Sequence, residues 1–206
     1  MKNTLILITL GVSSIIMAQN VTTKDGGTVY NSQNYVIDKM NVNDNFYLNK
    51  EYVKGSVKNY NGIRGYRYNA FTDDFEYLEN KNLYNLEKQD GLEVTLQNGQ
   101  IYRYDTFYDE KGELKKGYLQ ILTNSNSKNV LYKSVRISKS ELGNTNSYNN
   151  MSSVKFRTVS NYYLGNGNSI NQISKSNKDL NKIAKENKLN LNKEQDLIRL
   201  IDLLNK

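Results

Sequence analysis

Two copies of one eight-residue phrase, each placed after an Asn-Gly pair, constrain this chain more than any other feature. The phrases are YRYNAFTD at 66–73 and YRYDTFYD at 102–109, and the pairs are Asn61-Gly62 and Asn98-Gly99. A two-residue hairpin turn needs positive φ at both central positions, which Asn and Gly adopt at little cost. An Asn-Gly pair between alternating apolar residues therefore predicts an antiparallel hairpin at each copy.

Short strands separated by turn residues are predicted throughout residues 45–175. The alternation is clearest where Leu92, Val94 and Leu96 point to one face and the polar residues between them to the other. No helical pattern lies between the strands to make a parallel crossover. The fold class predicted is therefore mainly β, an antiparallel sandwich or partly open barrel. The other predicted strands are 52–58, 63–70, 75–79, 83–86, 101–108, 118–123, 130–138, 151–159, 162–164 and 170–173.

From residue 176 the apolar period changes from 2 to 3.6, which predicts an α-helical hairpin over 176–206. Ser176 with Asp179, and Asn192 with Gln195, have the spacing of helix-capping pairs. Helices this short are marginal alone in water, so their apolar stripes are predicted to pack on the sheet. A helix that binds a partner or a membrane surface is the alternative, although the polar side lacks a basic bias. The stripes are Leu180, Ile183, Ala184 and Asn187, then Leu197, Leu200, Ile201 and Leu204, widened by Ile198 and Leu203.

Residues 1–19 have the pattern of a secretory signal peptide. Lys2 precedes an apolar run, and the small residue Ala18 stands at the expected cleavage point. A transmembrane anchor is the alternative, but the run is shorter than the roughly 20 residues a spanning helix needs. The chain is therefore predicted to be exported to the periplasm or the extracellular space, with no transmembrane segment after cleavage. Residues 20–44 are interpreted as a polar N-terminal arm with one short strand at 35–37.

Three segments carry a resemblance to a protein family. They are Phe71 with Asp73–Tyr77, Lys116-Gly117-Tyr118, and the closing run Glu186–Leu204. In these segments the chain resembles a group of uncharacterised exported proteins typical of the Bacteroidota, which pair a β-rich body with a C-terminal helical segment. The resemblance spans about residues 50–205 and implies the same architecture. No activity is established for that group, so it assigns no functional residue.

The residue types that the chain lacks narrow its chemistry. Histidine and cysteine are both absent. The chain consequently has no Ser-His-Asp or Cys-His arrangement, no ordinary zinc site and no disulfide. Gly165-Asn166-Gly167 is a turn without the strand-to-helix context of a phosphate-binding loop. We predict no catalytic residue, no metal and no cofactor.

Two clusters of carboxylates remain as possible acids and bases. A carboxylate pair can hydrolyse a glycosidic bond when the two groups face each other about 5 to 9 Å apart. Such a hydrolase, acting on envelope polysaccharide, is the alternative function. Turn geometry and solvation also account for Asp and Glu at these positions, and neither cluster has calcium-loop spacing. The clusters are Asp73, Asp74, Glu76 and Glu79, and Asp109, Glu110 and Glu113.

The tyrosines of the two phrases are the predicted ligand-binding residues. Tyr66 and Tyr68 share one strand face, as do Tyr102 and Tyr104, and the arginine of each phrase points the other way. On neighbouring strands the four rings would form a patch able to stack on sugars or on an aromatic segment. The competing interpretation is that these rings pack in the core or as cross-strand pairs.

The net charge of +7 does not by itself identify a partner. Basic residues are dispersed, with no run longer than Lys115-Lys116, so a nucleic-acid partner is not expected. Positive charge can draw a protein toward anionic glycans or a lipid surface. The sequence therefore favours an exported, non-enzymatic binding or scaffolding β-domain of the cell envelope, with a glycan or an envelope protein as partner.

Overall fold

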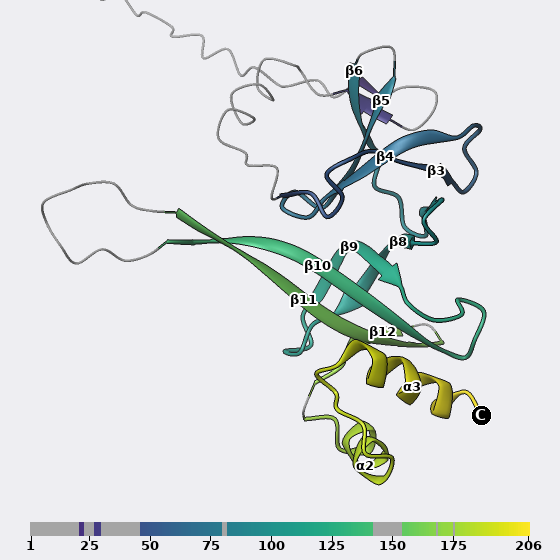
Figure 1. The fold of residues 1–206 in the computed structure, drawn as a ribbon, viewed down its shortest axis with the longest axis vertical. Coiled ribbons are helices and arrows are strands. Elements are labelled where there is room, and N and C mark those ends of the chain that lie inside the picture. The colour runs from purple at the N-terminus through teal and green to yellow at the C-terminus, as the bar shows by residue number, and fades with distance from the viewer. Residues whose placement is uncertain are drawn as a thin grey trace, which may run out of the picture.

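The computed structural model of this chain is mainly β with helices at its C-terminal end, as predicted (Figure 1). It describes residues 21–22, 27–29, 46–79, 82–141, 154–167, 169–174 and 176–206. The predicted signal peptide and the predicted strand at 35–37 lie outside these residues. Part of the predicted N-terminal arm is described, and it contributes two short strands to the sheet.

The described strands join in one sheet with the order β1-β2-β6-β5-β4-β3-β7-β8-β12-β11-β10-β9, and β8 also pairs with β9. Their bounds are β1 Val21–Thr22, β2 Gly27–Val29, β3 Val53–Val57, β4 Arg64–Asn69, β5 Asp74–Glu79, β6 Asn82–Leu86, β7 Glu93–Leu96, β8 Ile101–Tyr108, β9 Leu114–Ile121, β10 Asn129–Glu141, β11 Val154–Asn166 and β12 Ser169–Gln172.

Strands β8 to β12 close into a five-stranded barrel. Each strand pairs antiparallel with the next, and a parallel pairing of Asn171 with Tyr108 joins β12 to β8. Ile101 and Phe107 of β8 face a small apolar core inside the barrel, since alternate residues of a strand share a face. The other members of this core are Leu119, Ile121, Val130, Tyr132, Tyr163 and Ile170.

The remaining strands extend the sheet beyond β8 and enclose a second, larger core. Each YRY phrase forms the middle strand of an antiparallel meander, β4 between β3 and β5 and β8 between β7 and β9. Tyr66 and Tyr68 of β4 and Tyr102 and Tyr104 of β8 point into this core, together with Phe75, Tyr77 and Tyr118. Aromatic residues thus hold the extended sheet against the outside of the barrel.

The two Asn-Gly turns are not the two-residue turns predicted. At the second, Leu96 and Gln100 bracket a three-residue loop in which Leu96 N–H donates to the Gln100 carbonyl (2.8 Å). Gly99 alone takes positive φ, 86°, which is the geometry of a type I turn followed by a bulge. At the first, the loop between β3 and β4 is longer, and Asn59 rather than Asn61 has positive φ.

Helix α3 (Glu194–Leu204) packs against the barrel as predicted, and α2 (Lys178–Glu186) contributes Leu180 to the same apolar cluster (Figure 1). Leu197, Leu200 and Ile201 of α3 are fully buried in a third core, formed with outward-facing residues of β10 and β11. The predicted caps are wrong by one residue. Asn177 caps α2, and Lys193 precedes α3 without a side-chain cap.

The first residue of α3 also ties the helix to the barrel. Glu194 accepts hydrogen bonds from Lys133 of β10 (2.7 Å) and from the Tyr162 hydroxyl of β11 (3.0 Å). Burial would raise the pKa of Glu194, but these two donors lower it overall. Within the described residues, no helix is long and apolar enough to cross a bilayer.

Candidate functional site

The four predicted ligand-binding tyrosines lie together, but not at the surface. Tyr66, Tyr68 and Tyr102 are each at most 2% exposed, and Tyr104 is partly buried against the same core. The Tyr68 and Tyr102 rings stack with centroids 5.6 Å apart, although their strands are not neighbours in the sheet. The predicted exposed patch is therefore wrong, because both strands turn their tyrosine face toward the core between sheet and barrel.

The first carboxylate cluster is dispersed over separate ion pairs. Asp74 pairs with Lys88, Glu76 with Arg67 and Glu79 with Arg64. Asp74 and Glu76 share one face of β5 and Glu79 points to the other, and the three carboxylates have three different cationic partners, so the cluster does not act as one site. Two of these cations lie on β4, and Lys88 lies in the loop after β6.

The second carboxylate cluster belongs to the turn between β8 and β9. Asp109 and Glu110 line a cavity of about 460 Å³ at one end of the barrel. The backbone N–H of Glu113 lowers the pKa of Asp109, with help from the N–H of Lys111 and the Lys115 ammonium. A general acid needs a raised pKa, so this arrangement stabilises a turn rather than a proton donor.

Asp73 is a carboxylate that joins the sheet to the barrel. It accepts hydrogen bonds from the Tyr68 hydroxyl (2.7 Å) and the Tyr118 backbone N–H (3.2 Å), and pairs with Arg136 of β10 (2.9 Å). A Cβ atom on Gly117 would overlap both the carboxylate and the guanidinium. Burial raises the pKa of Asp73 even though Arg136 and these donors lower it.

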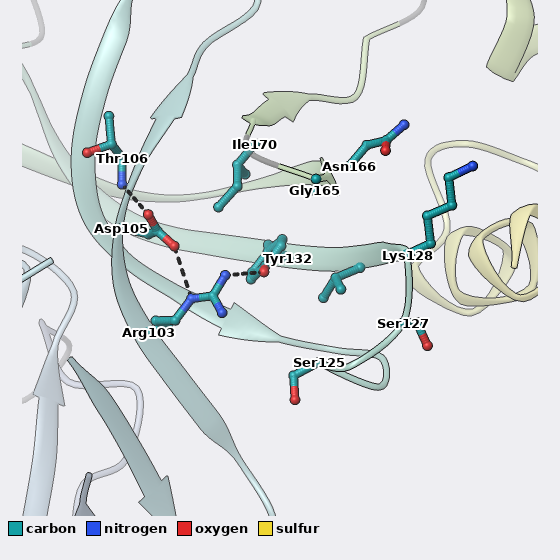
Figure 2. A pocket seen from close by; sticks show the side chains of 12 residues that line it. Arg103, Asp105, Thr106, Ser125, Ser127, Lys128, Tyr132, Gly165, Asn166 and Ile170 are labelled. Carbon is teal, nitrogen blue, oxygen red and sulfur yellow. Dashed lines mark hydrogen bonds and ion pairs between the residues drawn. The ribbon is translucent and has the colours of Figure 1, made fainter. Parts of the chain in front are cut away.

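A larger cavity lies at the other end of the barrel, and we call it the mouth site. It is a cavity of about 590 Å³ between β8, the loop from β9 to β10 and the turn from β11 to β12 (Figure 2). Its volume is within the range of small-molecule binding sites. Its lining residues are Arg103, Asp105, Thr106, Ser125, Ser127, Lys128, Val130, Tyr132, Gly165, Asn166, Gly167 and Ile170.

Arg103, Asp105 and Tyr132 form the polar centre of the mouth site. Arg103 Nε donates to Asp105 Oδ2 (3.0 Å), and Arg103 Nη2 donates to the Tyr132 hydroxyl. The other Asp105 oxygen accepts the Thr106 backbone N–H (2.9 Å), which fixes the carboxylate on its strand. Both charged side chains keep about a quarter of their surface exposed, 26% for Arg103 and 28% for Asp105. The pair is thus held in place and still accessible.

Tyr132 supports this centre from the barrel wall. Its ring lies on Gly165 of the neighbouring strand, where a Cβ atom would come within 2.6 Å of ring carbon Cε2. Because the ring is only 3% exposed, it contributes its hydroxyl rather than an open face. Burial raises the pKa of Tyr132, so the hydroxyl stays protonated at neutral pH.

Loop residues complete the mouth site with neutral polar groups. Ser125 and Ser127 come from the loop before β10, and Asn166 from the turn after β11. Figure 2 shows Arg103 and Asp105 on one side of the site and Ser127, Lys128 and Asn166 across from them, with the polar ends of Lys128 and Asn166 directed away from the pair. Val130 and Ile170 provide the apolar part of the lining. The arrangement offers hydrogen-bond donors and acceptors side by side on a rigid strand.

The sequence indicated only part of the mouth site. The alternation of β8 placed Arg103 on the face opposite to the tyrosines, and this is confirmed. The serines, Tyr132 and Gly165 join it only because β8 pairs with both β9 and β12. No local pattern indicates the closing parallel pairing.

Comparison with other proteins identifies no relative of this chain. No family model, no curated protein and no solved structure matches it.

Proposed function

We propose that this protein is an exported, non-enzymatic binding domain of the cell envelope, and that the mouth site is where it binds a glycan. The observation that carries this proposal is the Arg103–Asp105 pair, fixed by Tyr132 and Thr106 but still a quarter exposed in a cavity of about 590 Å³.

The chemistry of the mouth site favours a polyhydroxylated ligand. Adjacent sugar hydroxyls each donate and accept, so they match a guanidinium beside a carboxylate better than a simple anion does. Asp105 neutralises Arg103, which weakens the attraction for a simple anion. Ser125, Ser127 and Asn166 add neutral groups suited to further hydroxyls.

Replacing Arg103 with alanine is expected to weaken binding of oligosaccharides prepared from the envelope polysaccharide of the producing cell at least tenfold, since hydrogen bonds to a charged group are lost. Isothermal titration calorimetry measures the effect. Lys54→Ala removes one positive charge from an exposed position of β3 and is the matched control. Equal binding by the two variants would argue against the mouth site.

Export is proposed from the N-terminal pattern and is tested separately. N-terminal sequencing of the protein recovered from the periplasm or the medium is expected to begin at Gln19 or Asn20. Recovery of a chain in the cytoplasm that still begins at Met1 would contradict export without affecting the mouth site.

A further inference from the structure

The long hairpin of β10 and β11 runs on beyond the barrel (Figure 1). Strand β12 covers the outer edge of β11 from Tyr163 to Asn166, and Ile173 N–H donates to the Tyr162 carbonyl (2.8 Å). Among the residues that the structure describes, nothing pairs with the outer edge of β11 from residue 154 to residue 161. With a rise of about 3.3 Å per residue, the open stretch from residue 154 to residue 161 is longer than a typical strand.

The register of the hairpin shows which backbone groups point outward. The Tyr162 carbonyl faces the outer edge, and backbone direction alternates along a strand, so Ser160, Thr158 and Phe156 also present N–H and C=O groups outward. The pairing of Thr158 with Ile137 supports this outward direction for Thr158. The Ile137 N–H points away from β11 and donates to the Ala70 carbonyl (2.9 Å), so it does not bond Thr158. Within the part of the chain that the structure describes, these donors and acceptors therefore have strand geometry and no backbone partner.

We propose that this edge of β11 binds an extended peptide segment of a partner protein as an added strand. Strand addition obtains its affinity from main-chain hydrogen bonds and its specificity from alternate side chains. On one face the added strand would meet Phe156, which is 41% exposed and packs on Phe46 (4.6 Å between centroids). On the other face it would meet the exposed Arg157.

These two faces define the chemistry of the partner. A segment that alternates apolar and acidic residues places its apolar side chains beside Phe156 and its carboxylates beside Arg157. A second copy of this chain is disfavoured, because self-pairing would bring two such basic edges together.

The test uses the full chain and two fluorescein-labelled peptides, one of alternating Val and Glu and one of alternating Val and Lys. Fluorescence anisotropy should show binding of the acidic peptide and at least tenfold weaker binding of the basic one. Thr158→Pro should weaken binding of the acidic peptide roughly tenfold relative to Thr158→Ala, because proline removes one outward N–H and alanine keeps it. The hairpin tolerates this proline because that N–H does not pair with β10.

Three results would overturn the proposal. The first is no binding of the acidic peptide, or equal binding of the two peptides. The second is equal binding of the acidic peptide by the two Thr158 variants. The third is a wild-type dimer in sedimentation that Thr158→Pro dissociates, which would make a second copy the occupant of the edge.

Discussion

Replacing Tyr68 with alanine is expected to lower the free energy of unfolding by about 3–5 kcal/mol, the range for removing a large aromatic ring from a packed core. The Tyr68 ring is 2% exposed and contacts Phe75 (5.0 Å between centroids), Tyr102 (5.6 Å) and Tyr118 (6.1 Å). Its loss would open a cavity between sheet and barrel. Urea unfolding followed by circular dichroism measures the change.

Two further variants separate the contributions of Tyr68. Tyr68→Phe keeps the ring but removes the hydroxyl that bonds Asp73 and Arg136, so a loss of about 1.5–3 kcal/mol is expected. Tyr104→Ala should have a smaller effect than Tyr68→Ala, because Tyr104 is only partly buried. A Tyr68→Ala protein as stable as the wild type would indicate that the tyrosine rings lie at the surface, as the predicted binding patch requires.

Replacing Arg136 with methionine is expected to destabilise the protein by about 2–3 kcal/mol at pH 7, somewhat below the range for fully buried pairs. The expected loss is below that range because the Arg136 side chain is 28% exposed and the Asp73 side chain is 15% exposed. The variant leaves the Asp73 carboxylate without its cationic partner in the junction between sheet and barrel. Urea unfolding at several pH values measures the effect.

The pH dependence of this variant identifies its cause. Burial already raises the pKa of Asp73 above 3.8, and loss of Arg136 raises it further. The folded state then holds a proton more tightly than the unfolded state, so the unfolding free energy falls as pH rises from about 4 through the raised pKa. Below pH 4 both states are protonated, and the difference from wild type should shrink.

A second substitution completes the test. Asp73→Asn in the Arg136→Met background removes the buried charge and should restore part of the stability at pH 7. A destabilisation that stays constant from pH 4 to pH 7, with no rescue by Asp73→Asn, would show that Arg136 acts through packing alone.

The features of the fold that depend on local pattern could be predicted from the sequence. The alternation at Leu92–Leu96 and the stripe from Leu197 to Leu204 each bury the expected residues. Turn type was less predictable. Asn98-Gly99 reverses the chain as expected, but Gly99 alone takes positive φ. An Asn-Gly pair is compatible with more than one loop length, and the flanking strand register decides between them.

The candidate site depends on pairings that the sequence does not reveal. The YRY phrases fixed which side chains share a face, but not which face would be covered. Tyr102 and Arg103 are adjacent in sequence, yet one is buried between sheet and barrel and the other opens into the mouth site. That outcome follows from the closing pair Asn171–Tyr108, a contact between residues far apart in the chain.

We propose that binding occurs at the mouth of the barrel and not at the tyrosines. Chemical-shift mapping tests it most directly, by titrating oligosaccharides from the envelope polysaccharide into the ¹⁵N-labelled protein. We expect the largest shifts at the backbone amides of Arg103, Asp105, Ser125, Ser127 and Asn166. Largest shifts at Tyr66, Tyr68 and Tyr102, or no saturable shift at the mouth site, would contradict the account.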